Sequence, residues 1–581
     1  MRFAIALVAL LAAAVMIVAG VAQRTFLKPP TTISMSASAP ADVDYVVIPS
    51  SVLRAHPGQQ RLRLEGDGPV FAAYGRTADV TAWLSGERYA RLGVDAEAKA
   101  ATSQVAVAPS VAGLTGGGEP DPAGSDLWLD ERSGDRALDW PVDLPKGMSM
   151  IVASDGAHPA PSTIRLTWPV PPTTPVSGVL LAGGGALAVL GLVLYVWALA
   201  HVRRSRGPPR KPPSKRNRRP QPPRFKPTAP VTSGPSRGRR STAGRSAVHA
   251  AAPMLGAALV AGIVASAAGT APAASAAPRE PVATVGEQQA QRIVLHAAET
   301  AAKADGRHSV KLAERRFAGP ALELRTAAYA IRKKDKKYAL PPALPGAGAQ
   351  LKLILPEATA GWPRSLFAVV EDPSEKDKAP LALTMMQDDP RAAYKVHYAM
   401  ELPSETVLPV LPSALTGAKR LNPQNTVLRV APADLATDYG RVLRKSDAKE
   451  AALFDTSGDA LVKNVGEAAK KKIAKKLGGT ASISFADKTV DPEQVVALTT
   501  ANAVALVSVN LEEKWTVKPK RSGVTVRPSG GTKILAGTSS TGKGIQSVYG
   551  YQLLFQVPSA GSTEPIKLLG YAQGLVSAKE L

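Results

Sequence analysis

Few residues in this sequence have the types and spacing that catalysis or ligand binding requires, and the nearest to a known motif is a glycine-rich segment ending in lysine. The segment 537–543, Gly-Thr-Ser-Ser-Thr-Gly-Lys, nearly matches a phosphate-binding loop. Such a loop needs Ser or Thr after the lysine and a helix beginning there, so that backbone N–H groups and the helix dipole face the phosphates. Gly544 follows instead, and an alternating apolar pattern begins at Ile545. The segment is therefore predicted to be a hairpin turn.

The titratable residues give no clearer constellation. His296, His308 and His397 are the only histidines of the C-terminal region, and His296 lies among small apolar residues of a predicted helix. A structural histidine is favoured there over a catalytic one, although one His or Asp inside a pocket can do acid–base work. The pairs Glu371-Asp372 and Asp388-Asp389 stand beside prolines, where acids close turns. No nucleophile elbow or zinc-ligand spacing occurs, so we predict no catalytic residue, cofactor or metal site.

The most basic part of the sequence runs from Arg203 to Arg245, with fifteen Lys and Arg residues and no acid. The net charge is +24, but outside this stretch 56 of the 71 basic residues stand against 47 acidic ones, so the charge is mostly local. A nucleic-acid-binding protein more often spreads its charge over a folded domain, and no nucleic acid is expected. Basic residues beside a membrane helix stay cytoplasmic and attract anionic lipid, at about 1 kcal/mol each. The candidate lipid- or partner-binding residues are Arg203, Arg204, Arg206, Arg210, Lys211, Lys215, Arg216, Arg218 and Arg219.

Two further roles stay open for the same loop. The segment 208–213, Pro-Pro-Arg-Lys-Pro-Pro, has the composition of a polyproline ligand. Ser241 and Thr242 follow two arginines, as in a kinase site, and a phosphate there would reduce the local positive charge.

Three apolar segments divide the chain. Residues 1–23 are long enough to span a bilayer and are predicted to be a retained helix, with a signal peptide or signal anchor as the alternative. Residues 176–200 carry no charge and contain Tyr195 and Trp197 near their end, as membrane interfaces favour. Residues 250–270 are rich in Ala and Gly, which predicts a weak membrane helix or an internal signal, with an Ala-rich linker as the remaining alternative.

The positions of these segments predict a topology at the cell membrane. The chain begins inside, residues 24–175 are exterior, the basic loop 201–249 is cytoplasmic, and residues 279–581 are exterior. Within the second segment, Gly178, Ala182 and Ala186 lie four apart and form one candidate face for close helix packing, unless they only reflect how common Ala and Gly are in this chain.

The first exterior region is predicted to be an all-β, sandwich-like domain. Polar and apolar residues alternate over 60–65 and 163–167, and Gly and Pro punctuate the region. Its tryptophans are expected in the core, with a sugar-binding face as the alternative. The predicted strands are 43–48, 60–65, 70–75, 79–84, 149–154 and 162–168, and the tryptophans are Trp83, Trp128, Trp140 and Trp168.

The C-terminal region is predicted to hold two α+β copies, 279–425 and 426–581, each with helices before strands. Predicted helices are 288–304, 310–317, 320–331, 433–445 and 458–477. Predicted strands are 350–355, 366–371, 382–386, 394–401, 480–485, 495–514, 532–536, 545–556 and 566–576. Lysines 470–472 and 475–476 form a charged helical face, for which solvation is the simplest role and anionic wall polymers or lipid head groups are alternative partners.

Three segments of this region carry a resemblance. Arg316–Tyr329 (Arg-Phe-Ala-Gly-Pro-Ala-Leu-Glu-Leu-Arg-Thr-Ala-Ala-Tyr), Tyr549–Pro558 and Leu568–Ser577 resemble signatures of uncharacterised membrane proteins from high-GC Gram-positive bacteria. Helices followed by a long antiparallel sheet resemble the nuclear transport factor-like (cystatin-like) cone fold, here in tandem. The resemblance covers about residues 285–581 and implies a fold without a known activity. Some members carry a glycosyltransferase label, for which this chain shows no supporting residues.

The sequence therefore predicts a multidomain membrane protein of the cell envelope. It has no cysteine, which excludes disulfides, thiolate metal sites and cysteine nucleophiles. The favoured function is non-catalytic: exterior domains that bind another protein, a lipid or a wall glycan. The alternative is an envelope enzyme or enzyme subunit of glycosyltransferase type that acts on glycans.

Overall fold

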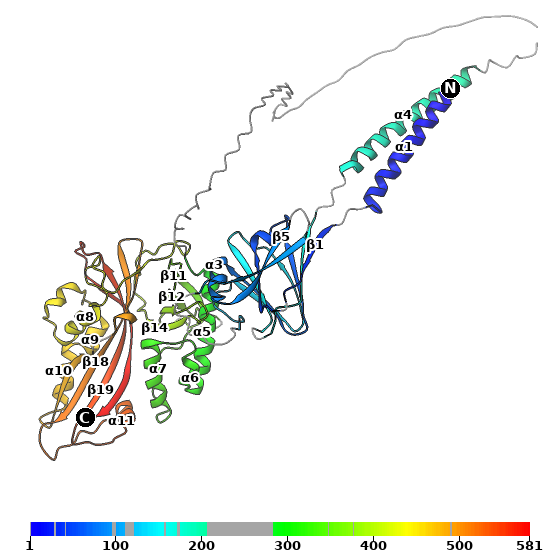
Figure 1. Cartoon of the computed structure of the whole chain (residues 1–581). Helices are drawn as coiled ribbons and strands as arrows, with labels where there is room; N and C mark the ends of the chain where they lie inside the picture. Colours follow the sequence, from blue (N-terminus) through cyan, green and yellow to red (C-terminus); the bar gives the residue numbers. More distant parts are fainter. Residues whose placement is uncertain are drawn as a thin grey trace, which may run out of the picture. The chain divides into compact units, whose positions relative to one another are not determined.

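The structure is a computed structural model that describes residues 2–27, 31–40, 42–95, 100–110, 121–155, 158–170, 175–205, 283–346, 348–375, 377–488 and 491–581. The chain divides into two compact units, one of Met1–Lys28 with Thr174–Arg279 and one of Pro29–Thr173 with Glu280–Leu581. In the described residues, the first unit is a pair of long helices and the second contains the sheets (Figure 1).

The first unit is an antiparallel pair of apolar helices, α1 (Arg2–Thr25) and α4 (Pro175–Ser205). The ring of Phe3 lies 5.7 Å from that of Tyr195, and at the other end Arg24 donates to the Ser177 hydroxyl. Both helices are long and apolar enough to cross a membrane, over Phe3–Thr25 and Val176–Arg204. The third predicted segment, 250–270, lies outside the described residues.

Glycines bring these two helices together. A Cβ atom added to Gly184 would stand 2.8 Å from Ile17 Cγ1, and one added to Gly191 would stand 2.9 Å from Leu10 Cγ, so both positions need a residue without a side chain. Small residues therefore do line the contact, as membrane helices favour. The candidate face of Gly178, Ala182 and Ala186 does not form this contact, because all three residues are exposed.

The N-terminal part of the second unit is rich in strands, as predicted. Among its described residues, one sheet has the order β1-β10-β3-β8 and the other β6-β5-β2-β9-β4-β7. Most neighbours are antiparallel, but β2 and β5 are parallel. The elements are β1 (Thr32–Ala37), β2 (Tyr45–Pro49), α2 (Ser50–Leu53), β3 (Gln60–Glu65), β4 (Val70–Arg76), α3 (Thr77–Trp83), β5 (Arg88–Asp95), β6 (Ala100–Val107), β7 (Asp130–Gly134), β8 (Ala137–Val142), β9 (Met148–Ala153) and β10 (Thr163–Pro169).

The two sheets enclose one core. The alternation of β3 points Leu62 and Leu64 inward, where they join Ile48 of β2 and Trp168 of β10. The opposite face of the second sheet is also buried, against α3, the 121–129 segment and Trp362 of the C-terminal part. Burial on both faces explains why β2 is apolar throughout, since neither of its faces meets water.

One predicted strand of this part was wrong, and the tryptophans lie in the core as predicted. Residues 79–84 were predicted as a strand but belong mostly to α3, which places Val80 and Trp83 one turn apart on the sheet. The sugar-binding alternative for the tryptophans also fails. Trp83, Trp128, Trp140 and Trp168 are at most 4% exposed, which leaves no ring face for a sugar.

The C-terminal part has helices before strands twice, as predicted. The first half contains α5 (Glu287–Arg307), α6 (Val310–Ala313), α7 (Gly319–Arg332), β11 (Gln350–Pro356), β12 (Arg364–Glu371), β13 (Leu381–Gln387) and β14 (Lys395–Glu401). The second half contains β15 (Arg420–Leu421), α8 (Leu435–Arg444), η1 (Lys449–Leu453), α9 (Ala460–Val465), α10 (Glu467–Lys476), β16 (Ala481–Lys488), η2 (Pro492–Gln494), β17 (Val496–Thr499), β18 (Val504–Pro519), α11 (Gly530–Ala536), β19 (Ile545–Pro558) and β20 (Lys567–Glu580).

Both halves contribute to one sheet that curls into a half-barrel. Its order in the described residues is β11-β12-β13-β14-β20-β19-β18-β17-β15, with β16 paired to β18. The concave side holds a core shared by the halves, in which Phe367, Tyr398 and Met400 meet Leu506 and Leu554. Helices α5–α7 cover the outside of the first half, and α8 and α9 cover that of the second (Figure 1). The halves are thus joined by a common core as well as by the chain.

Three elements differ from the predictions in this part. The predicted strand 495–514 is two paired strands, β17 and β18, with a turn between them. The other two differences concern helices. The predicted strand 532–536 is helix α11, whose Gly531 packs against Ile331 and Tyr338. The predicted helix 458–477 is two helices, because Gly466 leaves the helical conformation between α9 and α10. Gly531 packs against residues that are distant in the sequence, and Gly466 takes a conformation outside the helix. A local sequence pattern reports neither feature.

Candidate functional site

The N-terminal and C-terminal parts of the second unit are held together by buried ion pairs. Asp126 accepts from Arg316 Nη1 at 2.5 Å and from the backbone N–H of Tyr394 at 2.7 Å. The Asp126 carboxylate is 2% exposed and the Arg316 side chain 10%. A charge so far from water is tolerated only when it is paired. The pair therefore fixes the 121–129 segment on β14 and the α6–α7 connection.

A second buried pair joins α3 to β12. Asp79 accepts from Arg364 Nη2 at 2.8 Å, and each side chain is only 3% exposed. Arg364 also stacks over the Trp362 ring at 3.7 Å. Around these pairs, Arg391 donates to the carbonyl oxygen of Trp83 at 2.8 Å and Gln289 donates to that of Asp126 at 2.7 Å. Segments nearly 300 residues apart thus form one polar, desolvated interface.

Beside this interface, a cleft of about 780 Å³ opens between the two halves of the C-terminal part. Its lining comes from the start of α7, the β11–β12 and β13–β14 connections, β14, β15 and η2. The side chains that give it chemical character are Glu357, Trp362, Asp388, His397, Arg420, Asp491 and Glu493. Four carboxyl groups against one guanidinium make the lining acidic while His397 is neutral.

His397 is the most unusual group of this cleft. Neither ring nitrogen has a hydrogen-bond partner among the described residues, although both atoms are buried. Burial lowers the pKa of His397 to about 4, with Lys395 and Arg420 acting in the same direction and Asp388 opposing them. The ring is therefore neutral near pH 7, with one nitrogen able to donate and the other able to accept. A buried polar group without a partner is costly, which marks His397 as a candidate ligand contact.

The start of α7 leaves room for this ring. Gly319 has a φ of 49°, and a Cβ atom there would lie 3.2 Å from His397 Nδ1. Glycine is the residue that adopts this conformation without strain. The second half has a similar start at α9, where Gly458 has a φ of 82° and Asp459 accepts from the N–H groups of Leu461 and Val462. Both helices thus begin at or beside a glycine in the left-handed conformation.

The carboxyl groups of the cleft differ in their exposure and in their hydrogen bonds. Glu357 is 7% exposed and accepts from the N–H of Ser365 at 2.8 Å. Burial raises the pKa of Glu357, and Arg420 and Ser365 oppose that shift. Asp491 accepts from the N–H of Glu493 at 2.9 Å, which holds the start of η2. Asp388, Asp491 and Glu493 are exposed, and of these the Asp388 and Glu493 carboxylates accept no hydrogen bond from the described residues, so they are the carboxylates most open to an incoming ligand.

One turn further along α7, Glu323 faces the second half. Lys488 Nζ donates to Glu512 at 2.6 Å, and Glu323 forms a hydrogen bond with the same Glu512. The pKa of Glu323 is raised by burial and by the charge of Glu512, while Lys488 opposes the shift. Two carboxyl groups in contact favour one shared proton. This cluster joins α7, β16 and β18 and makes the junction of the halves polar.

Of the sequence-predicted binding residues, the structure describes only two. Arg203 and Arg204 are exposed in the last turn of α4. Arg206, Arg210, Lys211, Lys215, Arg216, Arg218, Arg219, Ser241 and Thr242 lie outside the described residues. The two acidic pairs are at turns, as predicted, since Asp372 caps Ser374 and Asp389 caps Arg391.

The glycine-rich segment 537–543 is not a phosphate-binding loop. It follows α11, with Gly537 in the left-handed conformation, and strand β19 begins two residues after Lys543. No helix starts where the phosphates would need one. Rejecting a phosphate-binding loop was right, but the predicted hairpin turn was wrong, because the segment joins helix α11 to strand β19 within the long connection between β18 and β19.

Sequence reasoning named His397 without recognising its position, because the residues around it come from segments over 170 positions apart. Its local signal is a polar residue in an alternating strand whose neighbours Val396 and Tyr398 are buried. That signal alone does not distinguish a ligand contact from an ordinary half-buried histidine.

Comparison with known proteins gives a family and no activity. Residues 281–580 match the family model described as "Domain of unknown function (DUF8094)". No curated protein and no solved structure matched the chain. The matched range contains both halves of the half-barrel and every residue that lines the cleft. Because the match covers more than half of the chain, the protein belongs to the family of this domain of unknown function.

Proposed function

We propose that the protein is a membrane-anchored, non-catalytic binding protein of the cell envelope whose folded unit works outside the cell. The observation that carries this proposal is the buried interface of Asp126–Arg316 and Asp79–Arg364. It joins residues before α4 to residues after the basic loop, and a protein interface of this kind forms only between parts on one side of a membrane. If α4 crosses the membrane, the chain must cross back before residue 283, which supports 250–270 as the third span.

The basic residues support one orientation of the helices in the membrane. The last turn of α4 carries Arg203 and Arg204, and the loop to Arg245 continues the positive charge. Such flanks stay on the cytoplasmic side, where anionic lipid holds them. The antiparallel pairing of α1 and α4 puts the start of α1 beside the end of α4, so the N-terminus is on the same side as the loop. The folded unit then lies on the exterior.

For the cleft, we propose a neutral, hydroxyl-rich ligand, the chemistry of a wall glycan. Four carboxyl groups and one arginine disfavour anionic ligands such as sugar nucleotides. Asp388 and Glu493 can accept hydrogen bonds from hydroxyl groups, and the neutral His397 can donate one and accept another. Trp362 adds an apolar ring at the rim. Orientation by a few polar groups in a concave site is how small-molecule sites gain specificity.

Calorimetric titration of the detergent-solubilised chain with a neutral N-acetylated oligosaccharide, beside a carboxylated analogue, tests this assignment. We expect the neutral sugar to bind more tightly. His397→Gln and Glu493→Gln should each weaken binding about tenfold, since one lost hydrogen bond to a ligand costs about 1 kcal/mol or more.

Asp447→Asn is the matched control, because Asp447 is an exposed acid outside the cleft. Preference for the carboxylated sugar, or equal loss in all three variants, would contradict the assignment. Turnover of a glycan that depends on His397 would favour the enzyme alternative instead.

A further inference from the structure

The far end of the half-barrel carries a concentration of positive charge that the cleft does not use. It is built from the loop after α7 (333–337), the end of α10 with its connection to β16 (475–480), and the end of β18 with its connection to β19 (518–544), together called the basic tip. These segments contain twelve Lys and Arg residues and one acid, Asp335. All twelve cations are exposed, and none forms an ion pair among the described residues.

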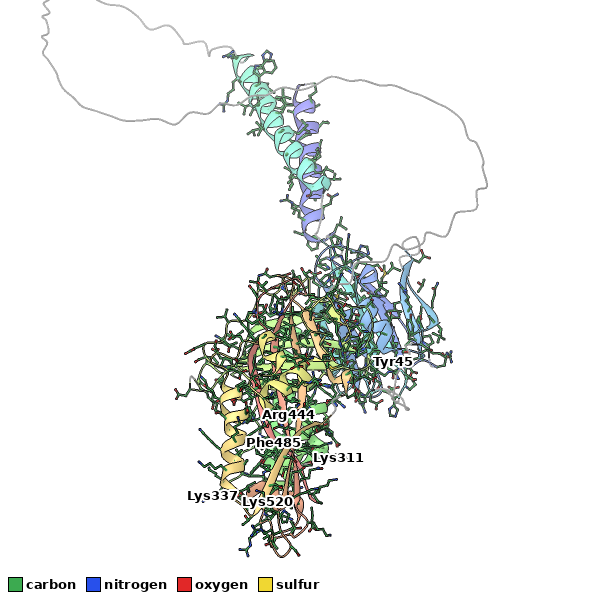
Figure 2. The ribbon with its side chains drawn as sticks, turned by 90° about the vertical axis from the view of Figure 1, so that its left-hand side faces the viewer. Tyr45, Lys311, Lys337, Arg444, Phe485 and Lys520 are labelled. Carbon is green, nitrogen blue, oxygen red and sulfur yellow. The ribbon has the colours of Figure 1, made fainter. Side chains whose placement is uncertain are left out.

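The three segments meet at one end of the fold. Lys520 donates its backbone N–H to Thr480, which joins the β18–β19 connection to the end of α10. A Cβ atom on Gly531 of α11 would lie 2.8 Å from Ile331 and 3.3 Å from Tyr338, which places the same connection against the loop after α7. Lys337 and Lys520 are both labelled at this end of the molecule in Figure 2.

Local structure separates these cations from the fold's own carboxylates. Lys470, predicted on the same charged face as Lys475 and Lys476, turns inward instead and pairs with Glu513 at 3.1 Å. Asp335 accepts from the backbone N–H of Lys337 at 3.0 Å, so it is engaged in a turn. The ion pair with Glu513 thus gives Lys470 a structural role. The exposed cations of the basic tip form no such pair among the described residues.

We propose that the basic tip binds a linear, phosphate-bearing polyanion of the cell wall. Clustered Lys and Arg bind polyanions through phosphate contacts and the release of counterions. Membrane docking is disfavoured because the described residues of the three segments include no large exposed apolar side chain, which interfacial binding uses. The ends of β1 and β10 that continue towards α1 and α4 also lie across the folded unit from the basic tip (Figure 1). The choice of a wall polymer rests on the proposed exterior placement.

The test uses the full chain in nanodiscs of zwitterionic lipid, with residues 206–249 replaced by an uncharged Gly/Ser linker of equal length so that the basic loop does not compete. Binding of fluorescent linear polyphosphate is followed by anisotropy over a salt series. The tip variant combines Lys518→Gln, Lys520→Gln, Arg521→Gln and Lys533→Gln. The control variant combines Lys146→Gln, Lys303→Gln, Lys419→Gln and Lys567→Gln, which removes the same charge from exposed lysines elsewhere.

We expect polyphosphate to bind the unsubstituted protein with an affinity that falls steeply with salt. The tip variant should bind about a hundredfold more weakly at low salt, with a salt slope smaller by roughly one unit for each cation that no longer meets a phosphate. The control variant should bind almost as tightly as the unsubstituted protein. Equal loss in both variants would reduce the effect to net charge and overturn the proposal.

Vesicles of phosphatidylglycerol form the second arm. Tip-dependent binding to these vesicles, with weak binding of polyphosphate, would assign the basic tip to a membrane and also overturn the proposal. A negative result in either arm would not contradict the proposed topology or the proposed glycan ligand of the cleft, because neither proposal depends on residues of the basic tip.

Discussion

Asp126→Asn is expected to destabilise the folded unit by about 3–5 kcal/mol, because it leaves Arg316 charged, buried and without its carboxylate. The substitution also weakens the acceptor for the Tyr394 N–H. Urea unfolding of the detergent-solubilised chain, followed by tryptophan fluorescence, measures the change. Trp128 lies two residues from Asp126 and is fully buried, so this interface contributes to the signal.

Asp139→Asn is the matched control. Asp139 pairs with Arg61 at 3.1 Å, but the two side chains are 44% and 59% exposed. An exposed pair contributes about 0–1 kcal/mol, so this variant should unfold almost as the native chain does. The double variant Asp126→Leu/Arg316→Met should regain part of the loss, because it removes both buried charges. Equal costs for Asp126→Asn and Asp139→Asn would mean that the interface is not desolvated as described.

The second large effect that we expect is a loss of folding stability as the pH falls. The pKa of His397 falls to about 4 in the folded state from an ordinary value of 6.5, so the unfolded chain binds more protons between these values. Stability from the neutral ring is complete above pH 6.5 and is lost as the pH falls towards 4. The native chain should lose about 3 kcal/mol over this window relative to His397→Gln, at 1.36 kcal/mol for each pKa unit.

The difference in stability between the native chain and His397→Gln isolates the contribution of His397. Glu323 and Glu357 have raised pKa values, so their protonation in acid stabilises the fold and acts in the opposite direction. Both proteins share them, and their contribution largely cancels. His158→Gln is the control, because the His158 side chain is 71% exposed. Parallel pH profiles for the native chain and His397→Gln would contradict the burial of a neutral ring.

Local pattern predicted much of the fold where burial follows a regular period. The alternation in 60–65 and 163–167 became β3 and β10, and the helix predicted over 288–304 became α5, whose buried face includes Ile293, Ala297 and Ala301. In each of these elements the core lies on one side only. The side-chain types therefore report directly which face is buried.

The failures have a common physical cause. In 79–84, β-branched Val80 and Thr81 favour a strand, but Asp79 is held by Arg364 from 285 positions away and α3 packs on both β9 and β4. The basic tip and the cleft are likewise assembled from segments that meet only after the sheet has curled. No local sequence pattern predicts which distant segments meet. The charge of the basic loop, by contrast, is a local feature that the sequence shows directly.

Under the proposed topology, residues on both sides of α4 fold together outside the membrane and are accessible from the exterior. The chain has no cysteine, so single substitutions can be labelled without background. Ser133→Cys, Ser522→Cys and Ser214→Cys probe the N-terminal part, the C-terminal part and the basic loop. With a membrane-impermeant maleimide on intact cells, we expect labelling at 133 and 522, and labelling at 214 only after permeabilisation. Opposite accessibility of 133 and 522, or labelling of 214 in intact cells, would contradict it.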